Sequence, residues 1–259
     1  DTARLAGDEP EAASLRVSAV LADRQGRVWA GVRYGGVLRY EDGRFTPFFS
    51  DLASARRSTR CLFEDARGGV WIGQHNATNL VRVQDEAAST IPLPADLPPV
   101  DVRVMAEDAA GGLWIGTDGN GLLRWKDGQF TRFTREQGLG SDFVWWLLPE
   151  PGGALWIGTY GGGLTRLKDG RAATCTTRHG LVDDVICRIA DDDRGNYWFS
   201  SNQGIFRASK RELNAFADGA RERIQCVAYD RSDGLPTLEC EGGSQSAGCR
   251  ARDGRLWFP

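Results

Sequence analysis

Short apolar stretches alternate with turn residues along most of the chain. In residues 100–141 the stretches "VRVMAED", "LWIGT", "LLRWK" and "FTRFT" are separated by "AAGG", "DGNG" and "DGQ". Tight turns between such stretches favour Gly, Asn and Asp, because these residues tolerate positive φ. The pattern predicts four short antiparallel strands within about 42 residues.

The same pattern recurs at a nearly fixed interval. One tryptophan marks the second stretch of each copy, at steps of 42 or 43 residues followed by a last step of 59: Trp29, Trp71, Trp114, Trp156, Trp198 and Trp257. Four strands in about 40 to 45 residues are typical of one propeller blade. The sequence therefore predicts an all-β fold, a β-propeller of four-stranded antiparallel blades, incomplete, with five blades and the start of a sixth.

The blades differ in length and regularity. We place them at about residues 15–54, 55–98, 99–141, 142–184 and 185–240, with the next one begun at 241–259 and a polar N-terminal segment at 1–14. The proline-interrupted "ASTIPLP" predicts an irregular fourth strand in blade two. Blade five is about 17 residues longer than the others. Its "SKRELNAFADG" predicts a short helical insertion with Ser209 as N-cap and Gly219 at its end.

The recurring tryptophan and glycines are predicted to form the scaffold. A glycine stands three residues before every tryptophan, and in most copies another stands two residues after it. A bulky ring that alternates with a small residue on a second strand suits packing between adjacent blades. We therefore expect Trp29, Trp71, Trp114, Trp156 and Trp198 to lie between blades. Trp145 and Trp146 share a first strand, so we expect one ring in the core and the other facing the channel.

Composition narrows the possible partners. With 259 residues and a net charge of −3, the chain can bury a core and has no electrostatic reason to bind nucleic acid. It has no run of 18 apolar residues and begins without a targeting signal, so no membrane insertion is expected within this segment.

The six cysteines do not form a disulfide framework. Cys61 and Cys187 are expected as buried thiols, and Cys240 and Cys249 as the pair to bridge in an oxidising compartment.

The repeat resembles a known family. The copies "AEDAAGGLWIGTDGNGLLRWKDGQFTRFTREQGLGSD" at 106–142 and "LWIGTYGGGLTRLKDG" at 155–170 are similar to the two-component-regulator propeller repeat, found in the sensory region of bacterial hybrid histidine kinases and related signalling proteins. The resemblance covers the chain from about Leu15 onward. It implies a periplasmic propeller in a longer sensor, whose remaining blades and output module are partners. It also suggests an oligosaccharide as one class of ligand.

The candidate ligand-binding residues lie on loops. In a propeller the second-to-third-strand loops and the connections between blades emerge at one edge, where binding residues are positioned by a rigid scaffold. Aromatic, amide and charged side chains there suit a sugar or another small polar ligand. The candidates are Arg33, Tyr34, His75, Asn76, Asp118, Asn120, Trp145, Tyr160, Asn202 and Gln203. Turn geometry alone would also explain the Asn and Asp residues, but not Arg33, Tyr34, His75 or Tyr160.

Catalytic and metal sites have little support in the sequence. His75 and His179 lie in different blades, and no nucleophile or zinc-protease motif occurs, so we expect no catalytic residue, cofactor or metal. Residues 191–193, "DDD", lack the spacing of a calcium loop and are interpreted as a solvated turn. The first hypothesis is a non-enzymatic ligand sensor. The second is a propeller enzyme such as a streptogramin-type or polysaccharide lyase, with His75 or His179 as acid or base. The third is a protein-interaction or homodimerisation platform.

Overall fold

The computed structural model describes residues 16–48, 57–240, 242, 245, 248–251 and 253–258. The chain divides into two compact units, Asp1–Met105 and Ala106–Pro259, and the boundary falls inside strand β9 (Val102–Glu107). Each unit is described by itself.

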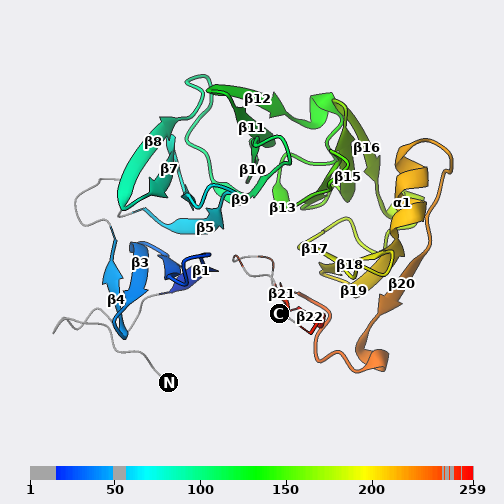
Figure 1. Cartoon of the computed structure of the whole chain (residues 1–259). Helices are drawn as coiled ribbons and strands as arrows, with labels where there is room; N and C mark the ends of the chain where they lie inside the picture. The colour runs from blue at the N-terminus through cyan, green and yellow to red at the C-terminus, as the bar shows by residue number, and fades with distance from the viewer. Residues whose placement is uncertain are drawn as a thin grey trace. The chain divides into compact units, whose positions relative to one another are not determined.

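Unit one contains the first two blades (Figure 1). Both are four-stranded antiparallel sheets in which neighbouring strands follow one another along the chain. Blade one consists of β1 (Val17–Ala22), β2 (Val28–Val32), β3 (Gly36–Glu41) and β4 (Arg44–Pro47). Blade two consists of β5 (Thr59–Glu64), β6 (Val70–Gln74), β7 (Asn79–Gln84) and β8 (Ala87–Pro92). The prediction of an irregular fourth strand in blade two is wrong: β8 pairs along its whole length, because Pro92 is its last residue and leaves the ladder intact.

Unit two contains blades four and five and most of blade three, again with the strands in chain order. Blade three continues from β9 with β10 (Leu113–Thr117), β11 (Leu122–Lys126) and β12 (Gln129–Phe133), and blade four has β13 (Val144–Pro149), β14 (Leu155–Thr159), β15 (Leu164–Lys168) and β16 (Arg171–Cys175). Blade five has β17 (Arg188–Asp191), β18 (Asn196–Ser201), β19 (Gly204–Ser209) and β20 (Cys226–Tyr229). A two-stranded sheet of β21 (Cys249–Arg250) and β22 (Leu256–Trp257) follows.

The predicted helical insertion is confirmed. Helix α1 (Lys210–Ala217) lies between β19 and β20, with Ser209 at the N-cap position and Gly219 in the left-handed region at φ 76°. The Ser209 side chain makes no capping hydrogen bond. Instead the Glu212 carboxylate accepts the Gln225 N–H at 2.9 Å and pairs with Arg221 at 2.6 Å, which holds the segment after the helix against its first turn.

Four of the five repeated tryptophans are buried as predicted. Trp29 and Trp156 are 0% and 1% exposed, and each lies in an apolar cluster drawn from two consecutive blades. The glycine two residues after Trp156, Gly158, leaves no room for a side chain, since a Cβ there would lie 2.7 Å from Ile186 Cγ2 at the start of the next blade. Trp198 is only half-buried. Tryptophan and glycine therefore recur together because each second strand packs against the next blade.

A buried carboxylate organises the first-to-second-strand turn, a role that the sequence analysis missed. In blade two the Asp65 side chain accepts the Gly69 N–H at 2.8 Å, the Trp71 Nε1–H at 2.8 Å and the Arg82 Nε–H at 2.7 Å. Burial opposes its ionisation, but these hydrogen bonds outweigh burial and lower its pKa. Asp23, Asp108 and Asp192 make equivalent bonds to Trp29, Trp114 and Trp198.

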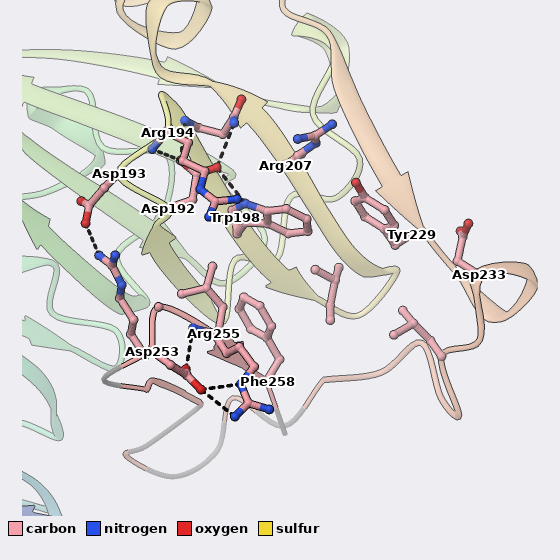
Figure 2. A pocket seen from close by; sticks show the side chains of 16 residues that line it. Asp192, Asp193, Arg194, Trp198, Arg207, Tyr229, Asp233, Asp253, Arg255 and Phe258 are labelled. Carbon is pink, nitrogen blue, oxygen red and sulfur yellow. Dashed lines mark hydrogen bonds and ion pairs between the residues drawn. The ribbon is translucent and has the colours of Figure 1, made fainter.

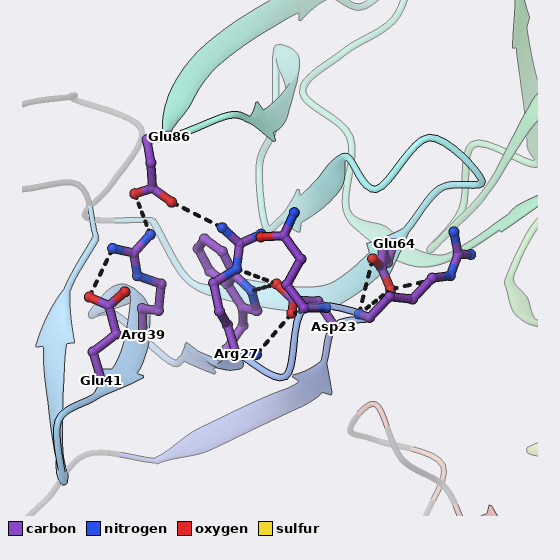
Figure 3. A network of polar contacts seen from close by, with 9 residues as sticks. Asp23, Arg27, Arg39, Glu41, Glu64 and Glu86 are labelled. Carbon is purple, nitrogen blue, oxygen red and sulfur yellow. Dashed lines mark hydrogen bonds and ion pairs between the residues drawn. The ribbon is translucent and has the colours of Figure 1, made fainter.

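In blade one this turn is tied to blade two through charge (Figure 3). Asp23 accepts from Trp29 and pairs with Arg27 at 2.6 Å. Glu86, in the third-to-fourth-strand turn of blade two, pairs with Arg27 at 3.0 Å and with Arg39. The turns of one blade thus cover the tryptophan face of the blade before it. We call the end of a blade that carries the first-to-second-strand and third-to-fourth-strand turns the turn edge. The opposite end, with the second-to-third-strand loops, is the loop edge.

Candidate functional site

Three aromatic rings and one carboxylate meet at the loop edge of unit two. The Trp145 ring lies 4.6 Å from the Tyr160 ring, centroid to centroid, at 31°, and its Nε1–H donates to Asp118 Oδ1 at 3.0 Å. The Phe143 ring lies beside Gly119, where a Cβ would come within 3.5 Å of it. Phe143 and Tyr160 are 46% and 47% exposed. We call Asp118, Phe143, Trp145 and Tyr160 the aromatic platform.

The backbone places these residues together. Trp145 is the extra residue of a β-bulge in β13, between the paired residues Val144 and Trp146. A bulge re-aims a side chain at the end of a strand. Phe143, just before β13, bridges Asp118 in the β10–β11 loop, and its carbonyl accepts the Tyr160 N–H at 2.9 Å. The platform therefore joins loops of blades three and four through main-chain bonds.

One of the two tryptophans on β13 packs in the core, as predicted. Trp145 belongs to the platform, whereas Trp146 packs against the apolar core of blades four and five. The Arg188 guanidinium lies 4.8 Å from the centroid of the Trp146 ring. Phe143 was missed by the sequence analysis, although its position at the start of a first strand of the repeat could have identified it.

The other candidates of unit two hold loops through their backbones. The Asn120 N–H donates to Thr117 Oγ1 at 3.0 Å, and its carbonyl accepts from Arg132 Nε at 3.0 Å. The Asn202 N–H donates to Asp183 Oδ2 at 3.0 Å, and the Gln203 N–H to Ser201 Oγ at 3.1 Å. These four hydrogen bonds all lead to residues outside the platform.

In unit one the candidates occupy the loop edge of blades one and two. Arg33 and Tyr34 are exposed, Tyr34 by 76%. His75 Nδ1 lies 2.6 Å from Asp101 Oδ1, which also accepts the Asn76 N–H at 2.7 Å. Tyr34 and Asn76 stand at equivalent positions, five residues after their tryptophans, and both have left-handed backbones, with φ 61° and 51°.

The second histidine has a structural role. His179 ends the 3-10 turn 177–179, and its Nδ1 accepts the Thr176 N–H at 3.0 Å. Its ring packs on Phe216 of α1 at 4.9 Å. The next residue, Gly180, is left-handed at φ 105°, and Leu181 is buried. Gly180-Leu181 after the fourth strand of blade four, like Gly138-Leu139 after that of blade three, is thus a turn that inserts a leucine into the core.

A groove of about 890 Å³ lies between blade five and the β21–β22 pair (Figure 2). The Trp198 ring stacks on Tyr229 at 5.2 Å and 20°, with the Arg207 guanidinium 5.6 Å from its centroid. Leu256 and Phe258 lie across the groove. In blade four the same face of the repeated tryptophan is covered by α1 and Tyr197 of blade five. We therefore interpret the groove as the packing face of Trp198, not as a ligand site.

The structure also bears on the cysteines and the acidic turn. All six cysteines are free thiols, so the expected bridge between Cys240 and Cys249 is absent; Cys240 is buried, whereas Cys249 is exposed. Within the described residues, no three His, Cys, Asp or Glu side chains are grouped as metal ligands.

The "DDD" segment is a turn, as predicted, but the Asp192 side chain is bound within it. Burial opposes its ionisation, and hydrogen bonds from Asn196, Arg194 and Trp198 outweigh burial and lower its pKa to about 2. No helix in the described part of the chain is long and apolar enough to cross a membrane.

Comparisons with known proteins support the identification of the propeller repeat. The family model described as two component regulator propeller matches residues 96–119. The extracellular domain assigned to a hybrid two-component system of B. thetaiotaomicron is 22% identical, with a TM-score of 0.57 over 95% of this chain and 38% of that one. A second B. thetaiotaomicron extracellular domain, assigned to a one-component system, is 17% identical, with a TM-score of 0.53 over 94% of this chain and 40% of that one.

A lyase has the same fold. A catalytically inactive histidine-to-alanine variant of virginiamycin B lyase from Staphylococcus aureus, with quinupristin, is 16% identical, with a TM-score of 0.64 over 96% of this chain and 86% of that one. No curated protein matches the sequence. The chain spans less than half the length of the two extracellular domains. It is a β-propeller that carries the two-component regulator propeller repeat and resembles the extracellular domains of two-component sensors.

Proposed function

We propose that this chain is the ligand-sensing part of an extracytoplasmic sensor and that its ligand is a carbohydrate bound without chemical change. The aromatic platform carries the proposal. Half-exposed rings beside a carboxylate are the groups that recognise a sugar, because the rings stack on its apolar face and the carboxylate accepts its hydroxyls. The similarity to extracellular domains of two-component systems supports the sensor role.

Binding would act through the junction of two consecutive blades. The platform residues are joined by main-chain bonds to two blades, so a ligand that contacts Phe143 and Tyr160 bridges loops of consecutive blades. A ligand shifts an equilibrium only by its differential affinity for the two states. A sugar that prefers one spacing of these loops would therefore bias the output module of the parent chain.

A titration of the chain with neutral oligosaccharides tests the proposal. Tyr160→Ala removes one stacking ring that is already half-exposed, so it should weaken binding about tenfold, since a lost aromatic contact is worth about 1–1.5 kcal/mol. Tyr40→Ala is the matched control, because Tyr40 is 37% exposed and lies on β3 near the turn edge. Equal binding by both variants, or no binding by the wild type, would refute the proposal. Mass spectrometry of the recovered ligand checks that it is unchanged.

A second candidate function is that of a lyase. His75 stands at ion-pair distance from Asp101 on an exposed loop, an arrangement that can orient an imidazole as a general base. The similarity to a lyase that is inactive as a histidine-to-alanine variant favours the same idea. If the recovered ligand is cleaved, His75→Ala should abolish the cleavage while His179→Ala leaves it intact, and the sensor proposal would then be replaced.

A further inference from the structure

Five arginines gather at the loop edge of unit one. They are Arg16, Arg33, Arg57, Arg60 and Arg103, which we call the arginine face. Arg16 and Arg33 are exposed, and the other three are half-buried. Only Arg33 was singled out by the sequence analysis, because the others lie at the starts of first strands and not on second-to-third-strand loops.

The backbone brings like charges together. The Arg33 N–H donates to the Arg16 carbonyl at 2.8 Å, so the two residues stand opposite each other at the ends of β2 and β1. Like charges opposite each other across an antiparallel pair repel. Neither side chain has an ion-pair partner among the described residues, so no carboxylate of the described chain offsets this repulsion.

Blade two adds two charges beside them. Arg60 is the extra residue of a β-bulge in β5, between Thr59 and Cys61. Arg57 donates from Nη1 to the Asn76 carbonyl. Ser58, between them, accepts the Tyr34 N–H on its Oγ at 3.0 Å, which ties the loop of blade one to blade two. The two blades therefore present their arginines on one continuous surface.

Arg103 extends the face along β9. Cys61 Sγ lies 3.9 Å from the Val102 carbonyl, so the starts of β5 and β9 are adjacent. The charge of Arg103 reaches the Cys61 thiol, where it opposes the dominant effect of burial, which raises the thiol pKa to about 12. The first strands of the blades thus carry the charges side by side.

Carboxylates are sparse on this face. The described part of unit one has eleven arginines and nine Asp or Glu residues. Four of those arginines, Arg16, Arg33, Arg57 and Arg60, stand against two carboxylates on the same edge, Asp96 and Asp101, and Asp101 is already bound by His75 and the Asn76 N–H. The remaining seven arginines and seven carboxylates are balanced. An excess of positive charge on one face of a chain whose net charge is −3 calls for an anionic ligand.

We infer that the arginine face binds an acidic carbohydrate, one that bears carboxylate or sulfate groups. The inference rests on the proposed function, since it names the class of ligand that the loop edge of unit one would take. Guanidinium groups bind carboxylate and sulfate oxygens with charge-assisted, often bidentate, hydrogen bonds. The exposed ring of Tyr34 beside Arg33 supplies a surface on which a sugar stacks.

Three probes of equal length test the inference by titration calorimetry on the whole chain: a neutral, a uronate and a sulfated tetrasaccharide. Arg33→Glu should keep the fold, since it places a carboxylate opposite Arg16. Arg44→Glu is the matched control, because Arg44 is exposed on β4 next to the turn edge. We expect at least one acidic probe to bind, its affinity to fall at least tenfold in Arg33→Glu and with added salt, and Arg44→Glu to match the wild type. The probe that binds distinguishes carboxylate from sulfate.

Three results would overturn the inference: acidic probes that do not bind, neutral and acidic probes that bind alike, or acidic binding that is the same in Arg33→Glu and Arg44→Glu. Its failure is separable from failure of the proposed function. If the neutral probe binds, Tyr160→Ala weakens its binding and the acidic probes do not bind, the proposed function is supported and the inference about the arginine face is refuted. If the acidic probe depends on Arg33 while the neutral probe does not bind, or binds equally to Tyr160→Ala and Tyr40→Ala, the arginine face is supported and the aromatic platform is refuted.

Discussion

Tyr34→Gly should stabilise the protein and weaken its binding of an acidic ligand. Tyr34 has φ 61° and is 76% exposed. A left-handed backbone costs a residue with a side chain about 1–2 kcal/mol, whereas glycine adopts it freely. The equivalent positions of blades three and four already hold Gly119 and Gly161, both with positive φ. Blade one therefore maintains a strained tyrosine where the repeat accepts glycine.

The net gain follows from two opposing effects. Relief of the left-handed backbone contributes about 1–2 kcal/mol, and the greater freedom of glycine in the unfolded chain removes about 0.5–1 kcal/mol. The exposed ring loses little apolar burial. The free energy of unfolding should thus rise by about 0.5–1 kcal/mol, which corresponds to a melting temperature about 1–4 °C higher for a chain of this size.

Urea unfolding and thermal melting of three variants test this reasoning. Tyr34→Ala removes the ring but keeps the strain, so its stability should stay close to that of the wild type. Asn76→Gly should gain less than Tyr34→Gly, because Asn tolerates the left-handed region. The reasoning fails if Tyr34→Gly is less stable than the wild type, or if Tyr34→Ala gains as much as Tyr34→Gly. Strain that persists at an exposed loop residue is typical of a functional site, so binding by Tyr34→Gly is measured in parallel.

Three further predictions concern the scaffold. Asp65→Ala should cost about 3 kcal/mol in urea unfolding, because it leaves the buried ends of Trp71 and Arg82 unpaired, whereas Asp253→Ala at an exposed turn should change little. The lowered pKa of Asp192 stabilises the fold above its ordinary value of 3.8, so that contribution to the unfolding free energy should be lost as pH falls from 3.8 towards 2, and Asp192→Asn should flatten the profile in that window. Native protein treated with iodoacetamide at pH 8 should be alkylated once, at Cys249, because four of the other thiols are buried and burial raises the pKa of the half-buried Cys226 to about 11; more than one adduct before unfolding would contradict this reasoning.

The sequence predicted the scaffold well because the repeat exposes its physical requirements. A tryptophan that must fill the space between blades, and a glycine that must leave space, stay at fixed positions whatever the loops do. The six turn glycines before the tryptophans all have positive φ, from 74° at Gly111 to 95° at Gly195. The packing of tryptophan and the turn at glycine are required in every blade, so these residues recur at a fixed spacing in the sequence. That spacing was enough to predict the blades.

The proposed binding surfaces were predicted less well because they depend on what differs between blades. The bulged position near the start of the first strand holds Arg60 in blade two and Trp145 in blade four, and at both residues the bulge interrupts the regular alternation of side chains. Strand alternation alone does not reveal a bulge. The loop residues Asn120 and Asn202 attracted attention by their type, yet the contacts seen there are made by their backbones.

Blade four shows how the scaffold absorbs a change without losing its packing. Glu150 stands where the other blades have the aspartate, and its longer side chain accepts the Tyr197 hydroxyl of blade five instead of bonding to its own tryptophan. Arg166, which would otherwise pair with that carboxylate, donates to Asn214 at 2.7 Å and pairs with Asp218, at the end of α1. Helix α1 of blade five thus covers Trp156 in place of a third-to-fourth-strand turn. The acidic residue and the arginine, which in blades two and three bond within their own blade, here bond to residues of the next blade. Because this exchange takes place at the turn edge, the loop edge of the same blade keeps the contact between the Trp145 and Tyr160 rings.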